Sequence, residues 1–497
     1  MPAEAESKAL MLFLAMPYSH TSRRRFLHHI YVDIHSVFQG QWAAAEIISS
    51  YCSSQDIPHP SFHPQAPGVT IPPSAPNAVQ NARQKLVASA AAVQRLATEP
   101  ADYLPHLAIH VCLARSAVHV HAPDPAFLTL SLIVLQYQQL ACLGWLCHFD
   151  VLARIPRDGT ISYSELANAT GVPKLQLRSV ARMVMTSNFL CEPTPNEVAH
   201  NAVSALFICN SSIPNWARFM VKFSAPVATA FAEATEKWGV TDKKNETAFN
   251  VALKTDLPFF NFLSQSSGLA ESFASYMRSV QSNYGTSLKH LLSGFDWAGV
   301  GEGVVVDVGG STCSSSIALA EAFPKLTCVV EDLPDTISDR LLIEQPKVLS
   351  SRISTKAYDF FTPQPVQGAD IYLLRMIMHD WPAADAILIL KNQLEALKAN
   401  PRAHLIVMDT VLPLPGSISA VEEALLRVRD LTMIQTFNSK ERELGEFEEL
   451  FSQVKDEGGC LVLRDIVKPA GSLMSVMDVV YESNIHSDSE IEKGLAH

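Results

Sequence analysis

The stretch that decides the fold is VVVDVGGSTC at residues 304–313. Its β-branched run Val304–Val306 has no polar interruption, which is typical of a parallel strand covered on both faces. Gly309 and Gly310 then allow a tight turn close to a ligand, because glycine has no Cβ atom and tolerates positive φ. Small residues lead on to an apolar segment at 317–320 that suits a helix. The pattern predicts the first βα unit of a doubly wound α/β sheet.

A second apolar strand, Leu326–Val330, ends at Glu331 and Asp332, roughly twenty residues after the glycine turn. A carboxylate there can accept hydrogen bonds from both hydroxyl groups of a ribose. The turn reads GGSTCS rather than GxGxxG, so it lacks the bare backbone that a pyrophosphate needs. Asp307 would also repel phosphate but suits a cation. A positively charged nucleoside without phosphate fits best, and S-adenosylmethionine is the common one.

A third apolar strand runs out into a loop within LLRMIMHDWP at 373–382 and presents His379 there. A phenol, with a pKa of about 10, is mostly protonated at neutral pH. An imidazole that removes this proton during attack on a methyl group accelerates the reaction by roughly a hundred- to ten-thousand-fold. His379 is therefore the candidate general base, and the competing interpretation is a packed or solvated histidine.

These segments form an ordered series that resembles the class I O-methyltransferases of the plant caffeate and flavonoid type. The series is still more similar to their fungal relatives that act on polyketides and other secondary metabolites, and it covers about 137 to 482. It consists of VDVGG at 306–310, VVEDLP at 329–334, DFFTPQPVQGADIYLLRMIMHDWP at 359–382, MDTVLP at 408–413 and RDLTMIQTFNSKEREL at 429–444.

The resemblance implies a Rossmann-like methyltransferase sheet that follows an N-terminal helical, winged-helix dimerisation domain. It implies a homodimer that methylates an aromatic hydroxyl of a small molecule, with S-adenosylmethionine as cofactor and no metal. Substrate contacts would come partly from Met433 and Asn438. The cofactor would be bound by Asp307, Gly309, Gly310, Asp332, Asp359, Phe360 and Arg375.

The resemblance also places two acids beside His379, namely Asp409 after the following strand and Glu441 before the arginine of a KER signature. Carboxylates in contact with an imidazole fix its tautomer and stabilise the imidazolium. The alternative is that Asp409 begins a turn and that Glu441 belongs to a solvated helix start.

One position departs from the family pattern, because Cys313 stands where a further glycine is usual. A thiol near the methionine group would narrow the pocket, so we expect Cys313→Gly to tighten cofactor binding. The departure also leaves open a catalytically impaired homologue that serves as a dimer partner or scaffold.

Residues 158–208 predict a helix-turn-helix followed by a polar wing at 191–201. This architecture also occurs in DNA-binding regulators, which are the third hypothesis. The basic residues on the second helix are Lys174, Arg178 and Arg182 only, and a net charge of −12 opposes phosphate binding. We therefore expect no nucleic-acid partner.

Nine scattered cysteines without CxxC pairs favour reduced thiols in the cytoplasm. The apolar stretch 126–146 contains three glutamines, so we read it as an interface helix rather than a membrane span. The predicted organisation has four parts. These are a poorly defined segment with a proline-rich linker at 1–78, a helical and winged domain at 79–267 with a possible insert at 106–134, a catalytic domain at 268–484 and a polar tail at 485–497.

Overall fold

The computed structural model describes residues 34–58, 71–72, 74–97, 125–209, 212–265, 268–269, 272–273, 276–277, 284–334, 336–337 and 351–484. These residues fall into two compact units. The smaller unit holds the helices before residue 99 and the start of the next one, and the larger unit holds everything described from Gln136 onward. The predictions for most of 106–134 and for the tail 485–497 lie outside the described residues.

Two helices of 21 residues each, α3 (Ile34–Ser54) and α4 (Asn77–Ala97), pack against each other in the smaller unit. Their core consists of Ala44, Ile48, Cys52, Ile71, Ala75, Val79 and Ala82. The members on α3 recur every four residues, which places them on one face of the helix. The segment that we expected to be poorly defined therefore contains a helix, because its apolar stripe is buried against α4 and the end of the proline-rich stretch.

Helix α6 (Pro125–His148) contains the apolar stretch that we read as an interface helix. Leu143 and Leu146 on this helix are fully buried in the larger unit, and Gln139 is buried with its amide near the Thr186 hydroxyl. Within the described ranges, no helix combines the length and apolar character needed to cross a membrane.

The predicted helix-turn-helix and wing are present. Helices α7 (Tyr163–Thr170) and α8 (Lys174–Met185) are followed by the antiparallel pair β2 (Cys191–Thr194) and β3 (Glu197–Ala199), which joins β1 (Ile161–Ser162) in a small sheet. Ser162 caps α7 in a capping box with Glu165. The apolar face of α8 is buried through Leu177, Ala181 and Val184, as its spacing predicts.

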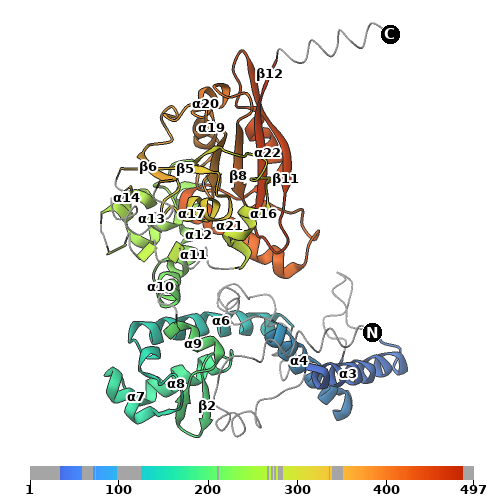
Figure 1. Cartoon of the computed structure of the whole chain (residues 1–497). Coiled ribbons are helices and arrows are strands. Elements are labelled where there is room, and N and C mark those ends of the chain that lie inside the picture. The colour runs from blue at the N-terminus through green and yellow to red at the C-terminus, as the bar shows by residue number, and fades with distance from the viewer. Residues whose placement is uncertain are drawn as a thin grey trace. The chain divides into compact units, whose positions relative to one another are not determined.

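A seven-stranded sheet forms the centre of the larger unit, in the order β11-β12-β8-β7-β4-β5-β6 (Figure 1). The five strands from β8 to β6 are parallel, whereas β11 and β12 are antiparallel to their neighbours. Their bounds are β4 Val304–Val308, β5 Thr327–Asp332, β6 Ile353–Ala357, β7 Ile371–Arg375, β8 His404–Asp409, β11 Gly459–Val467 and β12 Ser475–Ser483. The predicted doubly wound fold is confirmed.

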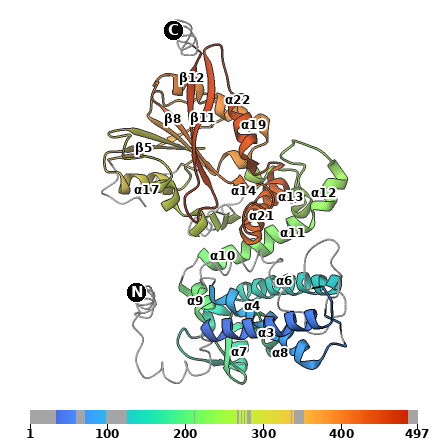
Figure 2. The ribbon, with the colours of Figure 1, turned by 90° about the vertical axis from the view of Figure 1, so that its right-hand side faces the viewer.

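Helices cover both faces of this sheet (Figure 2). On one face α19 (Ala383–Lys391), α20 (Leu394–Lys398) and α22 (Leu444–Ser452) pack on alternate strand residues such as Val306 and Leu374. On the other face α16 (Leu288–Ser293) and α17 (Ser314–Ala322) pack on Val305 and Leu373. Burial on both faces explains why the strands read as continuous apolar runs.

The remaining helices precede the sheet or follow β8. Among the described residues they are the 3₁₀ helix η3 (Leu152–Arg154), α9 (Ala202–Cys209), α10 (Ser212–Phe219), the π-helix η4 (Met220–Ser224), α11 (Ala225–Thr229), α12 (Phe231–Trp238), α13 (Ala248–Leu253), α14 (Phe259–Ser264), the 3₁₀ helix η5 (Tyr284–Thr286) and α21 (Ala420–Phe437). Helices α11 and α13 contact α21.

A short parallel pair fixes the segment after α21. β9 (Val411–Leu412) follows β8 directly and pairs with β10 (Arg442–Glu443), so that Arg442 lies opposite Val411. This pairing brings residues 441 and 442 beside the carboxyl ends of the parallel strands, where ligands bind in open α/β sheets.

Candidate active site

His379 lies just beyond the carboxyl end of β7. The strand ends at Arg375, Met376 takes a left-handed conformation with φ of 56°, and the 3₁₀ turn η6 (Met378–Asp380) follows. This sharp change of direction ends the strand and carries the imidazole into the interior, where His379 is only 5% exposed. The sequence placed His379 where a strand runs out into a loop, and the structure shows that its ring is buried there.

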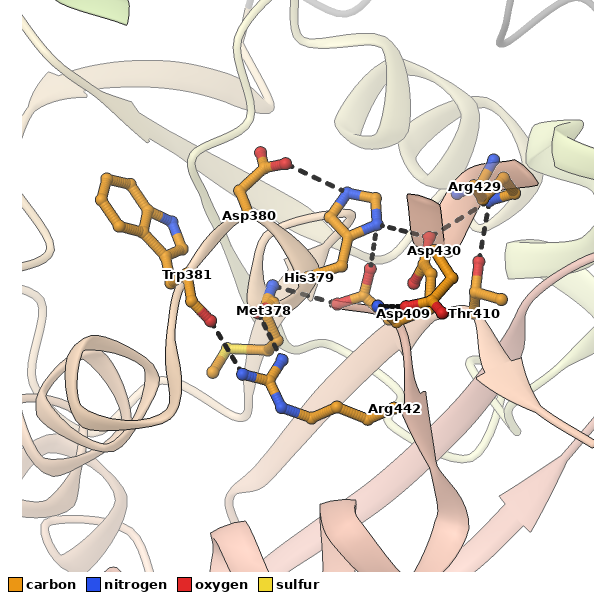
Figure 3. A network of polar contacts seen from close by, with 10 residues as sticks. Met378, His379, Asp380, Trp381, Asp409, Thr410, Arg429, Asp430 and Arg442 are labelled. Atoms are coloured by element: carbon orange, nitrogen blue, oxygen red, sulfur yellow. Dashed lines mark hydrogen bonds and ion pairs between the residues drawn. The ribbon is translucent and has the colours of Figure 1, made fainter. Parts of the chain in front are cut away.

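Three carboxyl groups surround the imidazole (Figure 3). Its Nδ1 lies 3.0 Å from Glu441 Oε1 and 3.6 Å from Asp409 Oδ1. Its Nε2 lies 3.6 Å from Asp380 Oδ1. The distance to Glu441 is that of a hydrogen bond and the other two are those of ion pairs. Glu441 therefore fixes the ring as a tautomer that donates from Nδ1.

Further contacts hold Asp409 and Glu441 in place. Asp409 Oδ2 accepts a hydrogen bond from the Met378 backbone N–H at 3.0 Å. The backbone N–H of Glu441 donates to Asp430 Oδ1 at 3.1 Å. Arg429 Nε donates to Glu441 Oε1 at 3.3 Å and to the Thr410 hydroxyl at 2.9 Å. Asp409 and Glu441 are almost completely buried, so neither is the turn residue or the solvated helix start of the alternative interpretation.

The charges around His379 oppose the effect of its burial. Burial alone would lower the pKa of the imidazole, but Glu441, Asp409 and Asp380 together raise it to about 9. Burial raises the pKa of Asp380 to about 7 and that of Asp409 to about 6, although His379 acts to lower both. The pKa of Glu441 is lowered, because His379 and Arg429 outweigh its burial. The cluster is thus a basic imidazole paired with one firmly ionised carboxylate.

The glycine turn approaches the same end of the sheet. Gly309 has a φ of 72°, and a Cβ atom there would lie 2.7 Å from Ile377 Cδ1, two residues before His379. The N–H groups of Gly309 and Gly310 donate to the Glu331 carbonyl at 2.7 and 3.0 Å. These bonds join the ends of β4 and β5, and the bare backbone of the turn lies against Ile377, on the segment that leads to His379.

Asp332 and Asp307 differ in their surroundings. Asp332 is partly exposed and accepts hydrogen bonds from the Ser311 and Leu333 N–H groups at 2.9 and 2.8 Å, and its carboxylate also bonds to the Thr336 side chain. Asp307 is buried, its Oδ2 accepts from the Ser316 hydroxyl at 2.8 Å, and burial raises its pKa to about 6. The geometry suits Asp332 to a ribose and makes Asp307 a residue that holds the turn against α17.

Arg375, Asp359 and Phe360 complete the predicted cofactor set. Arg375 is 8% exposed, and its Nη2 donates to the Thr286 carbonyl at 2.7 Å, while its buried Nε has no hydrogen-bond partner. Burial lowers its pKa to about 10 against the charges of Asp307 and Asp409. Asp359 is exposed after β6, and the half-buried Phe360 lies edge-on to Trp381 with ring centroids 5.6 Å apart.

The structure does not support the expected role of Cys313. Its side chain is fully buried in the apolar cluster that includes Val305 and Leu319, so the thiol packs into the core beside the sheet. Its backbone is left-handed, with φ of 61°. The left-handed backbone explains why the family pattern has a glycine at this position. The sequence pattern alone could not distinguish this need for a left-handed backbone from a need for space beside the cofactor.

Met433 and Asn438, the predicted substrate contacts, lie at the end of α21. Asn438 has a φ of 52°, and its side-chain amide donates to the carbonyls of Lys243 and Glu246 at 2.7 and 3.1 Å. The Met433 carbonyl accepts from the Ser439 N–H at 3.4 Å. In this structure Asn438 secures the loop between α12 and α13.

Sequence reasoning missed four residues of the site. Asp380 and Arg442 stand next to predicted residues in the HDW and KER segments, and that adjacency was the available signal. Arg429 is the first residue of the matched segment at 429–444, so the motif itself was the available signal. Lys244 gave no signal, yet its ammonium lies 4.2 Å from the Trp381 ring centroid and 2.7 Å from Asp385 Oδ2. In the described part of the chain, no group of three His, Cys, Asp or Glu side chains is arranged to hold a metal.

Comparison with known proteins gives two matching family models. An O-methyltransferase domain model matches residues 236–455. A second model, the N-terminal domain of the trypacidin cluster transcriptional coactivator tpcD, matches residues 42–98, which include most of α3 and all of α4.

Several curated relatives are fungal O-methyltransferases. The chain is 45% identical to O-methyltransferase VdtC of Byssochlamys spectabilis over 88% of this chain and 95% of that protein. It is 41% identical to O-methyltransferase pgmB of Aspergillus terreus over 87% of this chain and 92% of the relative. It is 40% identical to O-methyltransferase aurJ of Gibberella zeae over 88% and 95%.

Solved structures share the fold at lower identity. The mitomycin 7-O-methyltransferase MmcR matches with a TM-score of 0.59 and 22% identity over 72% of this chain and 98% of that one. OxaC in complex with SAH and oxaline matches with a TM-score of 0.62 and 20% identity over 81% and 100%.

Proposed function

The chain belongs to the class I, S-adenosylmethionine-dependent O-methyltransferases of fungal secondary metabolism, and on this premise we propose that its acceptor is an aromatic hydroxyl group of a polyketide. We further propose that His379 removes the proton of that hydroxyl. The observation that carries the second proposal is the buried imidazole held by Glu441 at 3.0 Å beside Asp409.

The residues around the glycine turn fit the cofactor. Gly309 and Gly310 have no side chains, so the backbone of the turn can approach the methionine part directly. Asp332 keeps a carboxylate lone pair for the ribose, and the unpartnered Nε of Arg375 is a buried donor at the same strand ends. Asp359 and Phe360 would contact the adenine. When bound, S-adenosylmethionine supplies the sulfonium methyl group that is transferred.

His379 performs the proton transfer in this proposal. Because Glu441 holds the Nδ1 proton, Nε2 carries the lone pair that accepts the proton of the hydroxyl group. The imidazolium that results gains stabilisation from Glu441 and Asp409, which are already in place and need no reorganisation. The base thus becomes charged among opposite charges, which favours loss of the phenolic proton as the oxygen attacks.

The experiment that tests this proposal compares two histidines. His379→Ala should lower kcat at least about a hundredfold with little change in the Kd for S-adenosylmethionine, since the imidazole touches the acceptor proton. His404, the first residue of β8, forms a hydrogen bond to Asp478 at 2.6 Å and supplies the matched control His404→Ala. Mass spectrometry on a panel of phenolic polyketides measures transfer. Near wild-type kcat in His379→Ala would exclude it as the base.

A second role, as a dimer partner or scaffold, is favoured by the match of residues 42–98 to a coactivator domain. On the helix pair, Trp42 is 71% exposed and lies on the side of α3 away from the core.

We propose that the chain is a homodimer in which residues 79–267 contribute the helical and winged domain and 268–484 the catalytic domain. Sedimentation velocity tests the dimer, and a chain that binds no cofactor by calorimetry would favour the scaffold.

We propose that the winged unit does not bind nucleic acid. Lys174 donates to the Ser164 hydroxyl at 2.7 Å, and Arg182 pairs with Glu192 through two bonds of 2.9 and 2.8 Å. These contacts turn two of the three cations on α8 toward their own unit. Salt-dependent affinity for duplex DNA would contradict the assignment. We propose a cytoplasmic location, because no disulfide joins the described cysteines, and cell fractionation would test it.

A further inference from the structure

Arg442 makes the two polar contacts that flank the histidine turn (Figure 3). Its Nη1 donates to the Met378 carbonyl at 2.7 Å and its Nη2 donates to the Trp381 carbonyl at 2.8 Å. The residue is 3% exposed, so the guanidinium makes these bonds away from bulk water. The two carbonyls belong to the residues on either side of the pair His379–Asp380.

The turn has few other backbone contacts to define it. Met376 is left-handed, which is unfavourable for a residue with a side chain, and η6 is only three residues long. Within η6 the bonds are those from Asp380 N–H to the Ile377 carbonyl at 3.1 Å and from Trp381 N–H to the Met378 carbonyl at 3.4 Å. A turn this short does not hold its own ends firmly, because 3₁₀ hydrogen bonds are geometrically poor.

Arg442 is itself held rigidly. Its backbone lies in β10, paired with β9 opposite Val411, and its guanidinium lies 5.9 Å from the Phe447 ring centroid. The preceding residue, Glu441, contacts the imidazole of His379. Two consecutive residues therefore fix the histidine, one through its ring and the other through its backbone.

We propose that Arg442 is a positioning residue of the methyl transfer, which sets the place of His379 by bridging the carbonyls at both ends of its turn. The inference rests on the proposed role of His379 as the base. It assigns Arg442 no contact with the acceptor or the cofactor.

Lysine cannot reproduce the bridge, because an ammonium is a single point of charge while the planar guanidinium reaches two acceptors at once. A displacement of about 1 Å in a reacting group costs roughly a hundredfold in rate. Arg442→Lys should therefore lower kcat roughly ten- to a hundredfold, with the Kd for S-adenosylmethionine within about threefold of wild type. The lysine keeps the positive charge near Asp409 and Glu441, so the pH at which kcat rises should stay in place.

Arg352 offers a matched control. It donates to the Leu326 and Ala320 carbonyls at 3.1 and 2.7 Å, so it also bridges two backbone carbonyls, but it does so just before the edge strand β6. Arg352→Lys should lower the Tm by an amount comparable to Arg442→Lys and leave kcat within about threefold of wild type.

The measurement is kcat per cofactor-binding site, with the sites counted by calorimetry, so that partial unfolding reduces the number of sites and not kcat. Equal kcat values in Arg442→Lys and Arg352→Lys would overturn the proposal. Loss of cofactor binding in both Arg442→Lys and Arg442→Gln would also overturn it, because the residue would then be purely structural.

His379→Ala assayed in parallel separates the positioning role of Arg442 from the proposed role of His379 as the base. If His379→Ala is active, the base assignment fails; if it is inactive while Arg442→Lys turns over normally, only the positioning role fails.

Discussion

Oε1 of Glu441 lies 3.0 Å from Nδ1 of His379, although the two residues are 62 positions apart in the chain. The same oxygen accepts a second bond from Arg429 at 3.3 Å. One carboxylate oxygen is therefore shared between a group that must gain and lose a proton and a guanidinium that stays charged. The positive charge of Arg429 therefore weakens the electrostatic attraction between the Glu441 carboxylate and the imidazolium.

Replacing Glu441 by glutamine tests this relationship. Glu441→Gln removes the charge that raises the pKa of His379, so the rise of kcat with pH should move to lower pH. The plateau of kcat should fall roughly ten- to a hundredfold, because the imidazolium loses its nearest counter-charge. Stopped assays between pH 5.5 and 10 measure both effects. An unchanged pH profile would show that Glu441 does not set the basicity of the ring.

The pH dependence of the wild type follows from the same cluster. The pKa of His379 is raised to about 9 in the folded chain, so the neutral base becomes more abundant as pH rises and kcat should climb between pH 7 and about 9. The contribution of His379 to the free energy of unfolding should instead fall as pH rises. A raised pKa stabilises the fold fully below the ordinary value of about 6.5, and this contribution is lost as pH rises through about 9.

Urea titrations of wild type and His379→Ala at pH 6 and pH 9.5 measure that contribution. The free energy of unfolding should differ between the two pH values by more in wild type than in the variant. Equal differences would indicate that the imidazole has the same pKa in the folded and unfolded chains.

Asp332→Ala should abolish measurable cofactor binding or weaken it more than about tenfold, because a ribose would lose charge-assisted hydrogen bonds worth roughly 1.5–3 kcal/mol. The carboxylate also holds the Ser311 N–H, so the Tm should fall as well. Asp465→Ala, at an exposed position of β11, is the control and should bind normally. Calorimetric binding of Asp332→Ala at wild-type strength would refute the ribose assignment.

Lys244, in the loop between α12 and α13, contacts the turn that contains His379 and Trp381. Its ammonium lies 4.2 Å from the Trp381 ring centroid and 4.9 Å from that of Phe361. Lys244→Ala should accelerate amide hydrogen exchange across the loop 239–247, because the cation–π contacts are lost. Lys237→Ala removes a similar contact to Trp238 at 4.3 Å that does not reach the turn, so it should leave that exchange unchanged. Identical exchange in the two variants would rule out a fastening role.

Cys313→Gly should leave the Kd for S-adenosylmethionine within about twofold of wild type, contrary to the tightening expected from sequence, because the thiol faces the core. The change in stability combines two opposing effects. Glycine relieves the left-handed backbone by about 1 kcal/mol, and removal of a buried side chain costs a similar amount. Calorimetry measures the Kd and thermal unfolding measures the net change in stability, and a Kd about tenfold tighter than wild type would restore the crowding argument.

Sequence patterns were sufficient to predict the doubly wound sheet, the helix-turn-helix unit and the enzyme family. Apolar strands, glycine turns and caps such as Ser162 act within a few residues, and motifs of fixed spacing carry the family, so both are legible along the chain. The ordered motifs also predicted that His379, Asp409 and Glu441 share one site. The catalytic roles of these three residues remain predictions.

The contacts that hold these residues in place depend on how distant segments pack together. The bridge from Arg442 to two carbonyls depends on the pairing of β9 with β10, and the Lys244 contacts join residues more than a hundred positions apart. The side to which the Cys313 thiol points follows from a single backbone angle and the packing around it. Distances and orientations of this kind arise from long-range packing, which leaves no local pattern in the sequence.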